Sequence, residues 1–339
     1  MTITVVGGGI AGLSLAWELA KCGREVALVE AGRIAGGASL AATSYMEPRF
    51  GRGASRRLEW AALERWPAYA AELEASSGLS VGLRHGQWRV AFAHDERRVR
   101  ADMERRRDLG WRVDWLPGDA LRERLPQLSR DVTGAALVRD PAWVDGPVVC
   151  AALTRALRSR GVTIRENERL QSVEGATVLA NGPGANALGL TFVPTVRRLK
   201  GTSLFYSAPF TPPCMLRHPD VSIVPRPDGV AAGASKEPDA TSLDPDPAVV
   251  ADLHARACRV LPALAEIEPE PRTGWRGYVD GTALALGRAR DVWWSLGHGG
   301  VGYLRAPVIA SELAGAICGE PDALDFCEPF FSSPQRAGS

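Results

Sequence analysis

The chain has 339 residues, with 40 basic and 39 acidic side chains and a formal net charge of +1 at pH 7. This balance does not indicate a general nucleic-acid or membrane partner. The length exceeds that of a usual single hydrophobic core, so we expect two domains. Six cysteines are scattered without Cys-x-x-Cys spacing, which argues against a metal centre or a disulfide framework and favours a cytoplasmic location.

The first thirty residues contain the pattern of a dinucleotide site. A strand, the sequence GGGIAG, a helix and a second strand are followed by Glu30. In such a unit Gly7 permits the tight turn, Gly9 admits a pyrophosphate at the helix N-terminus, and Gly12 lets the helix pack closely. Glu30 is placed to accept the ribose hydroxyls of an adenosine. A structural glycine turn or a secretory signal would explain fewer of these features.

Helices and strands alternate from there to about residue 180. Apolar spacing predicts a helix over 58–73, which Pro67 should kink or divide. The uncharged window 175–196 contains Asn, Gly and Pro, so we expect a buried strand and turn there and no membrane anchor. The other predicted elements are strands at 86–92, 111–116, 162–164 and 176–180 and helices at 97–109 and 147–160.

The part beyond residue 200 is richer in strands and ends in a second glycine-rich turn. A strand at 292–296 runs into GHGGVG, a turn suited to bind an anion or a carbonyl. A plain structural turn is the commoner use of such glycines, but one large cofactor bridging both glycine turns would explain both. The remaining predictions are strands at 201–206, 221–224 and 230–234 and helices at 247–261 and from Pro307 to Ile317.

The chain resembles the FAD-dependent glycine oxidase and D-amino-acid oxidase family. The matching pieces, in order, are GGGIAGLSLAWELA with Glu30, GGAS with YMEP, WLPGDALRERLPQL, WVD, VLANG, VPRPDG with GASKE, GWRGYVDG and GHGGVGYLRAP. The resemblance implies an α/β protein with a Rossmann-type FAD-binding domain and a second, mostly antiparallel β-sheet substrate domain. The expected ranges are 1–80, 144–197 and 273–326 for the FAD-binding domain, 81–143 and 198–272 for the substrate domain, and 327–339 for a C-terminal tail.

The resemblance also implies which residues contact FAD. Those expected at the ADP half are Gly7, Gly9, Ile10, Ala11, Gly12, Glu30 and Ala31. Those expected beside the flavin are Ser39, Thr43, Ser44, Tyr45 and Met46. The second turn is expected at the pyrimidine edge and comprises Gly297, His298, Gly299, Gly300, Val301 and Gly302. Gly182 and Tyr303 are two further expected contacts.

The resemblance assigns Arg276, in GWRG, to the carboxylate of the substrate, which a planar guanidinium binds in a bidentate way. Tyr303 and Tyr278 are candidate hydrogen-bond donors near it, with packing roles as the alternative. His298 is expected to contribute backbone contacts rather than to act as a general base. Three features depart from glycine oxidases: Tyr45 replaces a small residue, the second turn lacks the arginine that some of them carry, and the hairpin between Ile164 and Val178 is shortened. In addition, no lysine can be placed over the flavin as an oxygen activator.

The implied reaction is oxidation of the C–N bond of glycine, a small D-amino acid or another small amine. A hydride passes from the α-carbon to flavin N5, the imine is hydrolysed, and oxygen yields hydrogen peroxide. The alternatives are a dehydrogenase that reduces a quinone or a protein, an oxidase for an alkylated amine of a biosynthetic intermediate, a noncatalytic flavoprotein and a nicotinamide-binding scaffold. FAD should be noncovalent, because no histidine follows GGAS and Cys318 lies inside the last helix. The oligomeric state stays open.

Overall fold

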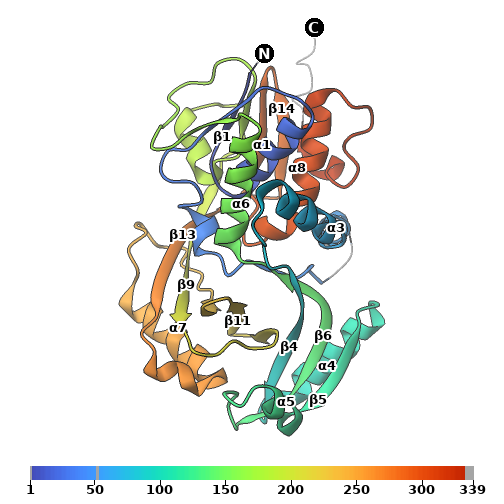
Figure 1. Cartoon of the computed structure of the whole chain (residues 1–339), viewed down its shortest axis with the longest axis vertical. Helices are drawn as coiled ribbons and strands as arrows, with labels where there is room; N and C mark the ends of the chain where they lie inside the picture. Colours follow the sequence, from blue (N-terminus) through green and yellow to red (C-terminus); the bar gives the residue numbers. More distant parts are fainter. Residues whose placement is uncertain (1, 51–52, 333–339) are drawn as a thin grey trace.

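The structure is a computed structural model that describes residues 2–50 and 53–332. Within these residues the strands form two sheets, one above the other along the long axis of the molecule (Figure 1). The upper sheet has the order β16-β14-β15-β8-β1-β2-β7, and its neighbouring strands are parallel except β14 and β15. Its strands are β1 (Ile3–Val6), β2 (Val26–Val29), β7 (Thr163–Arg165), β8 (Thr177–Leu179), β14 (Ala285–Ala289), β15 (Val292–Leu296) and β16 (Phe331–Ser332).

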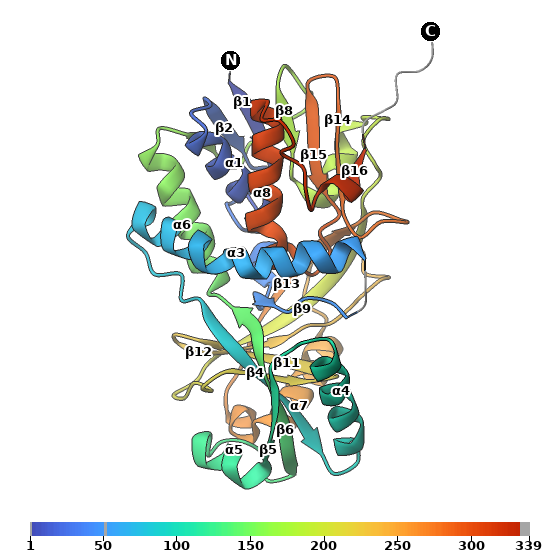
Figure 2. The ribbon, with the colours of Figure 1, turned by 90° about the vertical axis from the view of Figure 1, so that its right-hand side faces the viewer.

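The predicted strand-turn-helix-strand unit is present at the start of the chain. Val5 and Leu28, at the centres of the parallel strands β1 and β2, are fully buried. Parallel strands need a crossover connection, which helix α1 (Ile10–Lys21) provides. Helices α6 (Gly146–Ser159) and α8 (Gly302–Cys318) pack against α1, and α3 (Ala54–Ser77) lies across the molecule between the two sheets (Figure 2).

The lower sheet has the order β13-β9-β12-β11-β10-β4-β6-β3, with β5 beside β6. All neighbouring pairs are antiparallel except β10 and β4, which confirms the predicted fold class. The strands are β3 (Tyr45–Met46), β4 (Arg84–Phe92), β5 (Val113–Pro117), β6 (Val132–Trp143), β9 (Arg197–Ser207), β10 (Met215–His218), β11 (Val221–Arg226), β12 (Gly229–Gly233) and β13 (Glu270–Tyr278). The helices α4 (Glu96–Asp108), α5 (Gly118–Arg124) and α7 (Pro247–Val260) accompany this sheet.

Two prolines lie inside helices, where the sequence suggested a kink or a new segment at Pro67 and a helix start after Pro307. Pro67 does not divide α3, and the last helix begins at Gly302 rather than after Pro307. Pro307 has no N–H to offer the carbonyl four residues earlier, which belongs to Tyr303. The indole of Trp66 on α3 donates to that carbonyl at 3.1 Å. A side chain from a neighbouring helix therefore replaces the missing backbone hydrogen bond.

The predicted domain ranges differ from the sheet boundaries at four places, of which the smallest is Arg197, the first residue of β9. Strand β13 crosses the expected boundary between residues 272 and 273, and β3 pairs with β6 of the lower sheet. The expected tail begins with Cys327, which is buried, and its strand β16 pairs with β14. The rest of that tail, 333–339, lies outside the described residues. No helix in the described ranges is both long and apolar enough to cross a membrane.

Candidate active site

A cavity of about 590 Å³ is lined by residues of both sheets and by both glycine-rich turns. The first turn contributes Gly7 and Gly9, and the second contributes Gly297 and Gly300. The two turns are nearly three hundred residues apart in sequence, yet they border one space. This volume is within the usual range of ligand and cofactor sites.

The first turn directs the N-terminus of α1 into the cavity. Gly7 has φ 111°, and a Cβ at this position would lie 2.7 Å from the Ala180 carbonyl oxygen, so only glycine fits the turn. The turn leaves α1 without a side-chain cap at Gly9, while Ser39 Oγ accepts a hydrogen bond from the Ile10 N–H at 2.9 Å. Unpaired N–H groups at a helix N-terminus favour an anion such as a pyrophosphate.

The Glu30 carboxylate is fixed at the end of β2 by two backbone donors. Oε2 accepts from the Gly8 N–H at 2.6 Å, and Oε1 accepts from the Gly32 N–H at 2.8 Å. Glu30 lines the cavity beside the first turn. The carboxylate therefore has a fixed position in which its remaining lone pairs can accept hydroxyl groups of a ligand.

The second turn places a neutral imidazole on the cavity wall. His298 Nε2 lies 3.1 Å from Ser295 Oγ, and Nδ1 is buried without a hydrogen-bond partner in the described part of the chain. Burial, together with the smaller effect of the Arg305 charge, lowers the pKa of His298 to about 4. A base with this pKa is a poor proton acceptor near pH 7, which agrees with the expectation that His298 contributes contacts rather than general-base catalysis.

The two candidate tyrosines differ in what their side chains contact. The buried Tyr303 hydroxyl donates to the Ser39 carbonyl at 3.0 Å and lies 3.4 Å from Cys150 Sγ. This hydroxyl is used inside the protein, which supports the packing role. Tyr278, at the end of β13, lies against Gly299 of the second turn, where a Cβ would approach its ring to 2.8 Å.

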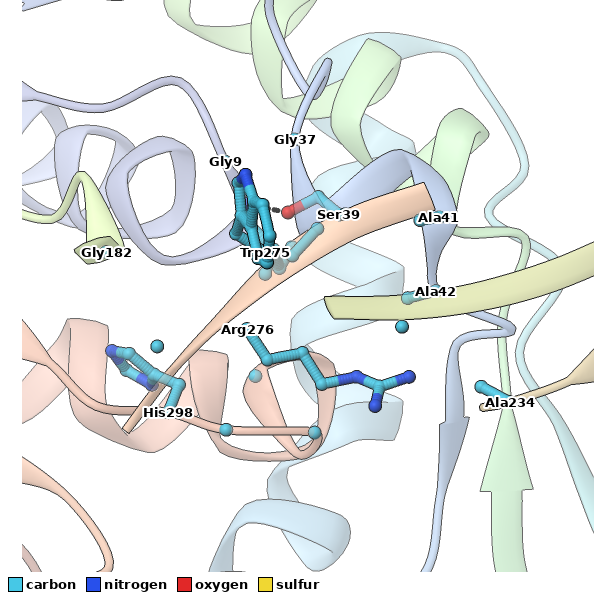
Figure 3. Close-up of a pocket in the computed structure, with 18 of the residues that line it drawn as sticks. Gly9, Gly37, Ser39, Ala41, Ala42, Gly182, Ala234, Trp275, Arg276 and His298 are labelled. Atoms are coloured by element: carbon cyan, nitrogen blue, oxygen red, sulfur yellow. Dashed lines mark hydrogen bonds between the residues drawn. The ribbon is translucent and has the colours of Figure 1, made fainter. Parts of the chain in front are cut away.

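Arg276 extends from β13 along the cavity (Figure 3). Its Nη1 donates to the Ser235 carbonyl at 2.9 Å. Its guanidinium lies directly over Gly201 of β9, where a Cβ would come within 2.1 Å of Nη2. A side chain at position 201 would therefore displace the guanidinium from this place. Arg276 forms no ion pair with any described residue, so its donors remain available to an anionic ligand.

Most of the predicted site residues line this cavity, and four do not. Ala31 is exposed beside it, and Met46 is fully buried in the core. Val301 packs against the core, and Gly12 packs against the Gly7 carbonyl, as its predicted packing role requires. The predicted residues on the cavity wall are Gly7, Gly9, Ile10, Ala11, Glu30, Ser39, Thr43, Ser44, Tyr45, Gly182, Arg276, Tyr278, Gly297, His298, Gly299, Gly300, Gly302 and Tyr303.

Several wall residues were missed by the sequence analysis. Lys236 follows strand β12 in the GASKE motif, which was a usable signal, and Asn181 follows β8 in VLANG. Trp275 adjoins the recognised Arg276. No sequence signal distinguished Arg217 or Ser203, because their places on the wall depend on how distant strands pair.

The cavity contains polar atoms that lack partners within the protein. Asn181 Oδ1, Ser203 Oγ and His298 Nδ1 are buried and have no hydrogen-bond partner among the described residues. Buried polar groups are costly unless they are satisfied. Together with the α1 N-terminus and Glu30, they fit a dinucleotide whose ring system carries hydrogen-bonding edges.

A family model described as DAO, FAD dependent oxidoreductase, matches residues 2–316, and the chain belongs to this family of FAD-dependent oxidoreductases. A glycine oxidase of Bacillus licheniformis is 25% identical over 371 aligned residues, covering 98% of this chain and 97% of the relative. A glycine oxidase of Bacillus subtilis is 26% identical and covers 96% of this chain and 95% of the relative. The crystal structure of glycine oxidase from Geobacillus kaustophilus superimposes with a TM-score of 0.88 at 25% identity, covering 98% of each chain.

These similarities confirm the predicted family and the two-domain fold. The protein is an FAD-dependent oxidoreductase of the glycine oxidase type that acts on C–N bonds. The individual site residues, the domain ranges and the substrate stay predictions.

Proposed function

We propose that the protein oxidises the C–N bond of a small amino acid or amine that bears a carboxylate, using noncovalently bound FAD. The observation that supports this most directly is the Arg276 guanidinium, which lies on the same cavity as both glycine turns and has no acidic partner in the described ranges. A guanidinium left unpaired beside a cavity is suited to a carboxylate, because its fork matches both oxygens.

The residues that would hold FAD follow from the site. The N-terminus of α1 would bind the pyrophosphate, and Glu30 would accept the ribose hydroxyls. The second turn, with His298, would face the flavin edge. Bound FAD would accept the hydride that leaves the carbon next to the amine nitrogen, and the resulting imine would be hydrolysed by water.

The protein's own part in the reaction is orientation and electrostatics. Arg276 would bind the carboxylate and so fix the α-carbon in one position. His298, neutral near pH 7, would add no positive charge of its own to the second turn. No described cavity residue is a cysteine and the only histidine there is His298, which supports noncovalent binding. The sheet that contains Arg276 would form most of the substrate domain, with the upper sheet as the FAD-binding domain.

The test is anaerobic bleaching of the flavin absorbance by glycine, sarcosine and D- and L-amino acids. Bleaching by one of these classes is expected, followed by hydrogen peroxide release when oxygen is admitted. A purified protein that binds no flavin on reconstitution, or a flavin that no amine bleaches, would contradict the proposal. Slow reoxidation by oxygen after bleaching would instead favour the dehydrogenase alternative, with a quinone or a protein as acceptor.

A further inference from the structure

The cavity wall contains a second guanidinium, that of Arg217 on β10, which is half-buried and has no acidic partner among the described residues. Its Nε is buried without a hydrogen-bond partner, and its Nη1 contacts Ser222 Oγ. Like Arg276, it forms no ion pair with a described residue. Charged groups withdrawn from water are usually paired. Two unpaired guanidinium groups on one cavity are therefore more than a single carboxylate requires.

The strand register places both guanidinium groups over the same face of the lower sheet. Arg217 is opposite Ser222, Ser222 is opposite Gly233, and Gly233 is opposite Ser203. Opposed residues in antiparallel strands point to the same face. Gly201, under the Arg276 guanidinium, lies two residues before Ser203 on β9 and so faces the same way. The small residues Ser222, Gly233, Ser203 and Gly201 therefore lie between the Arg217 and Arg276 side chains.

The distance between the two cations follows from the same register. The Arg276 guanidinium lies over β9, and that of Arg217 lies over β11, with β12 between them. Two strand spacings correspond to about 10 Å across the sheet, and the two residues from Ser203 to Gly201 add about 7 Å along it, so the two guanidinium groups lie roughly 12 Å apart. One small molecule with two carboxylates separated by a short chain of atoms is therefore long enough to contact both guanidinium groups.

The remaining charges near these two arginines do not neutralise them. Arg89, opposite Arg217 on β4, has its own ion pairs with Glu47 and Asp102. Lys236 adds a third positive charge to the wall and forms no ion pair with a described residue. Two acidic residues line the cavity, Asp220 and Glu30. The Asp220 carboxylate lies 3.3 Å from His218 Nδ1 and offsets at most one of the three positive charges. Glu30 is held at the first glycine turn by two backbone N–H groups. This part of the cavity therefore has excess positive charge after one carboxylate has bound.

We infer that the substrate bears two carboxylates, one bound by Arg276 and the other by Arg217. This inference rests on the proposed function and specifies its substrate class: an amino acid with an acidic side chain, or a secondary amine with an acid group on each arm. Arg217 is then the residue that selects diacids, because it contacts a group that monoacid substrates lack.

The experiment compares substrates that differ by one carboxylate. Sarcosine and iminodiacetate differ on the nitrogen substituent, and D-alanine and D-aspartate differ on the side chain. The wild-type holoenzyme should have a higher kcat/KM for the diacid of at least one pair. In Arg217→Gln that diacid-to-monoacid ratio should fall roughly 10- to 100-fold, as expected for one lost charge-assisted hydrogen bond. Arg217→Lys keeps the positive charge and should therefore show a diacid-to-monoacid ratio between those of the wild type and Arg217→Gln.

Controls distinguish the loss of the diacid preference from misfolding and from a general loss of positive charge. Arg97→Gln removes an exposed arginine of α4 with no ion pair to a described residue and should leave the ratio unchanged. Each variant must retain its flavin and its flavin absorbance spectrum. A wild-type ratio near one for both pairs, or a ratio unaffected by Arg217→Gln but lost in Lys236→Gln, would overturn the assignment.

A binding measurement distinguishes failure of this inference from failure of the proposed function. Butyrate and glutarate differ by one carboxylate and have no amine to oxidise. Their dissociation constants, measured from the shift in flavin absorbance, should favour glutarate in the wild type and lose that preference in Arg217→Gln. If glutarate is preferred but no amine bleaches the flavin, the diacid site stands and the proposed reaction fails. If amines bleach the flavin but glutarate binds no better than butyrate, the diacid inference fails.

Discussion

The Arg305 guanidinium and the Glu59 carboxylate form an ion pair, Nη2 to Oε1 at 2.6 Å, in which both side chains are fully inaccessible to solvent. Arg305 Nη1 also donates to the Ala283 carbonyl at 2.7 Å, and Glu59 Oε2 accepts from the Arg49 N–H at 2.8 Å. The pair joins α3 to α8 three residues beyond the second glycine turn. It therefore fixes the helix whose first turn borders the cavity.

Glu59→Gln should lower the free energy of unfolding by about 3–5 kcal/mol, because it leaves the Arg305 charge buried without a counter-ion. Urea denaturation of the holoprotein measures this. Glu104→Gln is the matched control, since it removes an exposed pair with Arg107 on α4 and should cost less than about 1 kcal/mol. Equal costs for the two variants would show that the buried pair does not determine stability.

Gly12→Ala should impair FAD retention. A Cβ at this position would lie 1.9 Å from the Gly7 carbonyl oxygen, so α1 would have to move away from the first turn. We expect at least a tenfold increase in the FAD dissociation constant, measured by flavin fluorescence on dilution. Gly175→Ala is the control: no atom lies within 4 Å of its Cβ, and its positive φ should cost about 1–2 kcal/mol of stability with FAD retained. Equal FAD retention in both variants would contradict the role of Gly12.

The first turn was predictable because its evidence is local. Strands β1 and β2 are apolar and short, glycines lie at the required positions, and Glu30 ends the unit. Helix α6 was predictable for the same reason, since Asp145 precedes it and accepts a hydrogen bond from the Val148 N–H. Local rules of this kind locate elements without knowledge of their partners.

Strand β13 shows what local patterns do not reveal. It contains Arg276 and was recognised only through the GWRG motif, not as a strand. It is the edge of the lower sheet and is half-exposed along most of its length, so it lacks the alternation of apolar and polar residues that marks a strand with one buried face. Arg217 was missed because its place on the cavity results from the register of β10 and β11, which only the assembled sheet determines.

Arg276→Ala should raise KM for the carboxylate substrate by about 100-fold or more, because the charge-assisted bidentate contact is lost. Bound FAD should be retained, since the guanidinium contacts the Ser235 carbonyl and the cavity rather than either glycine turn. Steady-state kinetics and the ratio of flavin to protein absorbance check both parts. Arg97→Ala, the removal of an exposed arginine on α4, serves as a control. Unchanged kinetics in Arg276→Ala would show that Arg276 does not bind the substrate carboxylate.

His298 should make the stability of the protein depend on pH. Its pKa is about 4 in the folded protein, against about 6.5 when unfolded, so the unfolded chain binds more protons between these values. The free energy of unfolding therefore has its full value above pH 6.5. It falls as the pH is lowered to 4, by at most about 3 kcal/mol from this group. Urea denaturation of the wild type between pH 7 and pH 4.5 should show this loss, and His298→Gln should show a flatter dependence in the same range. Parallel curves for the two proteins would mean that the imidazole is protonated as easily in the folded chain as in the unfolded one.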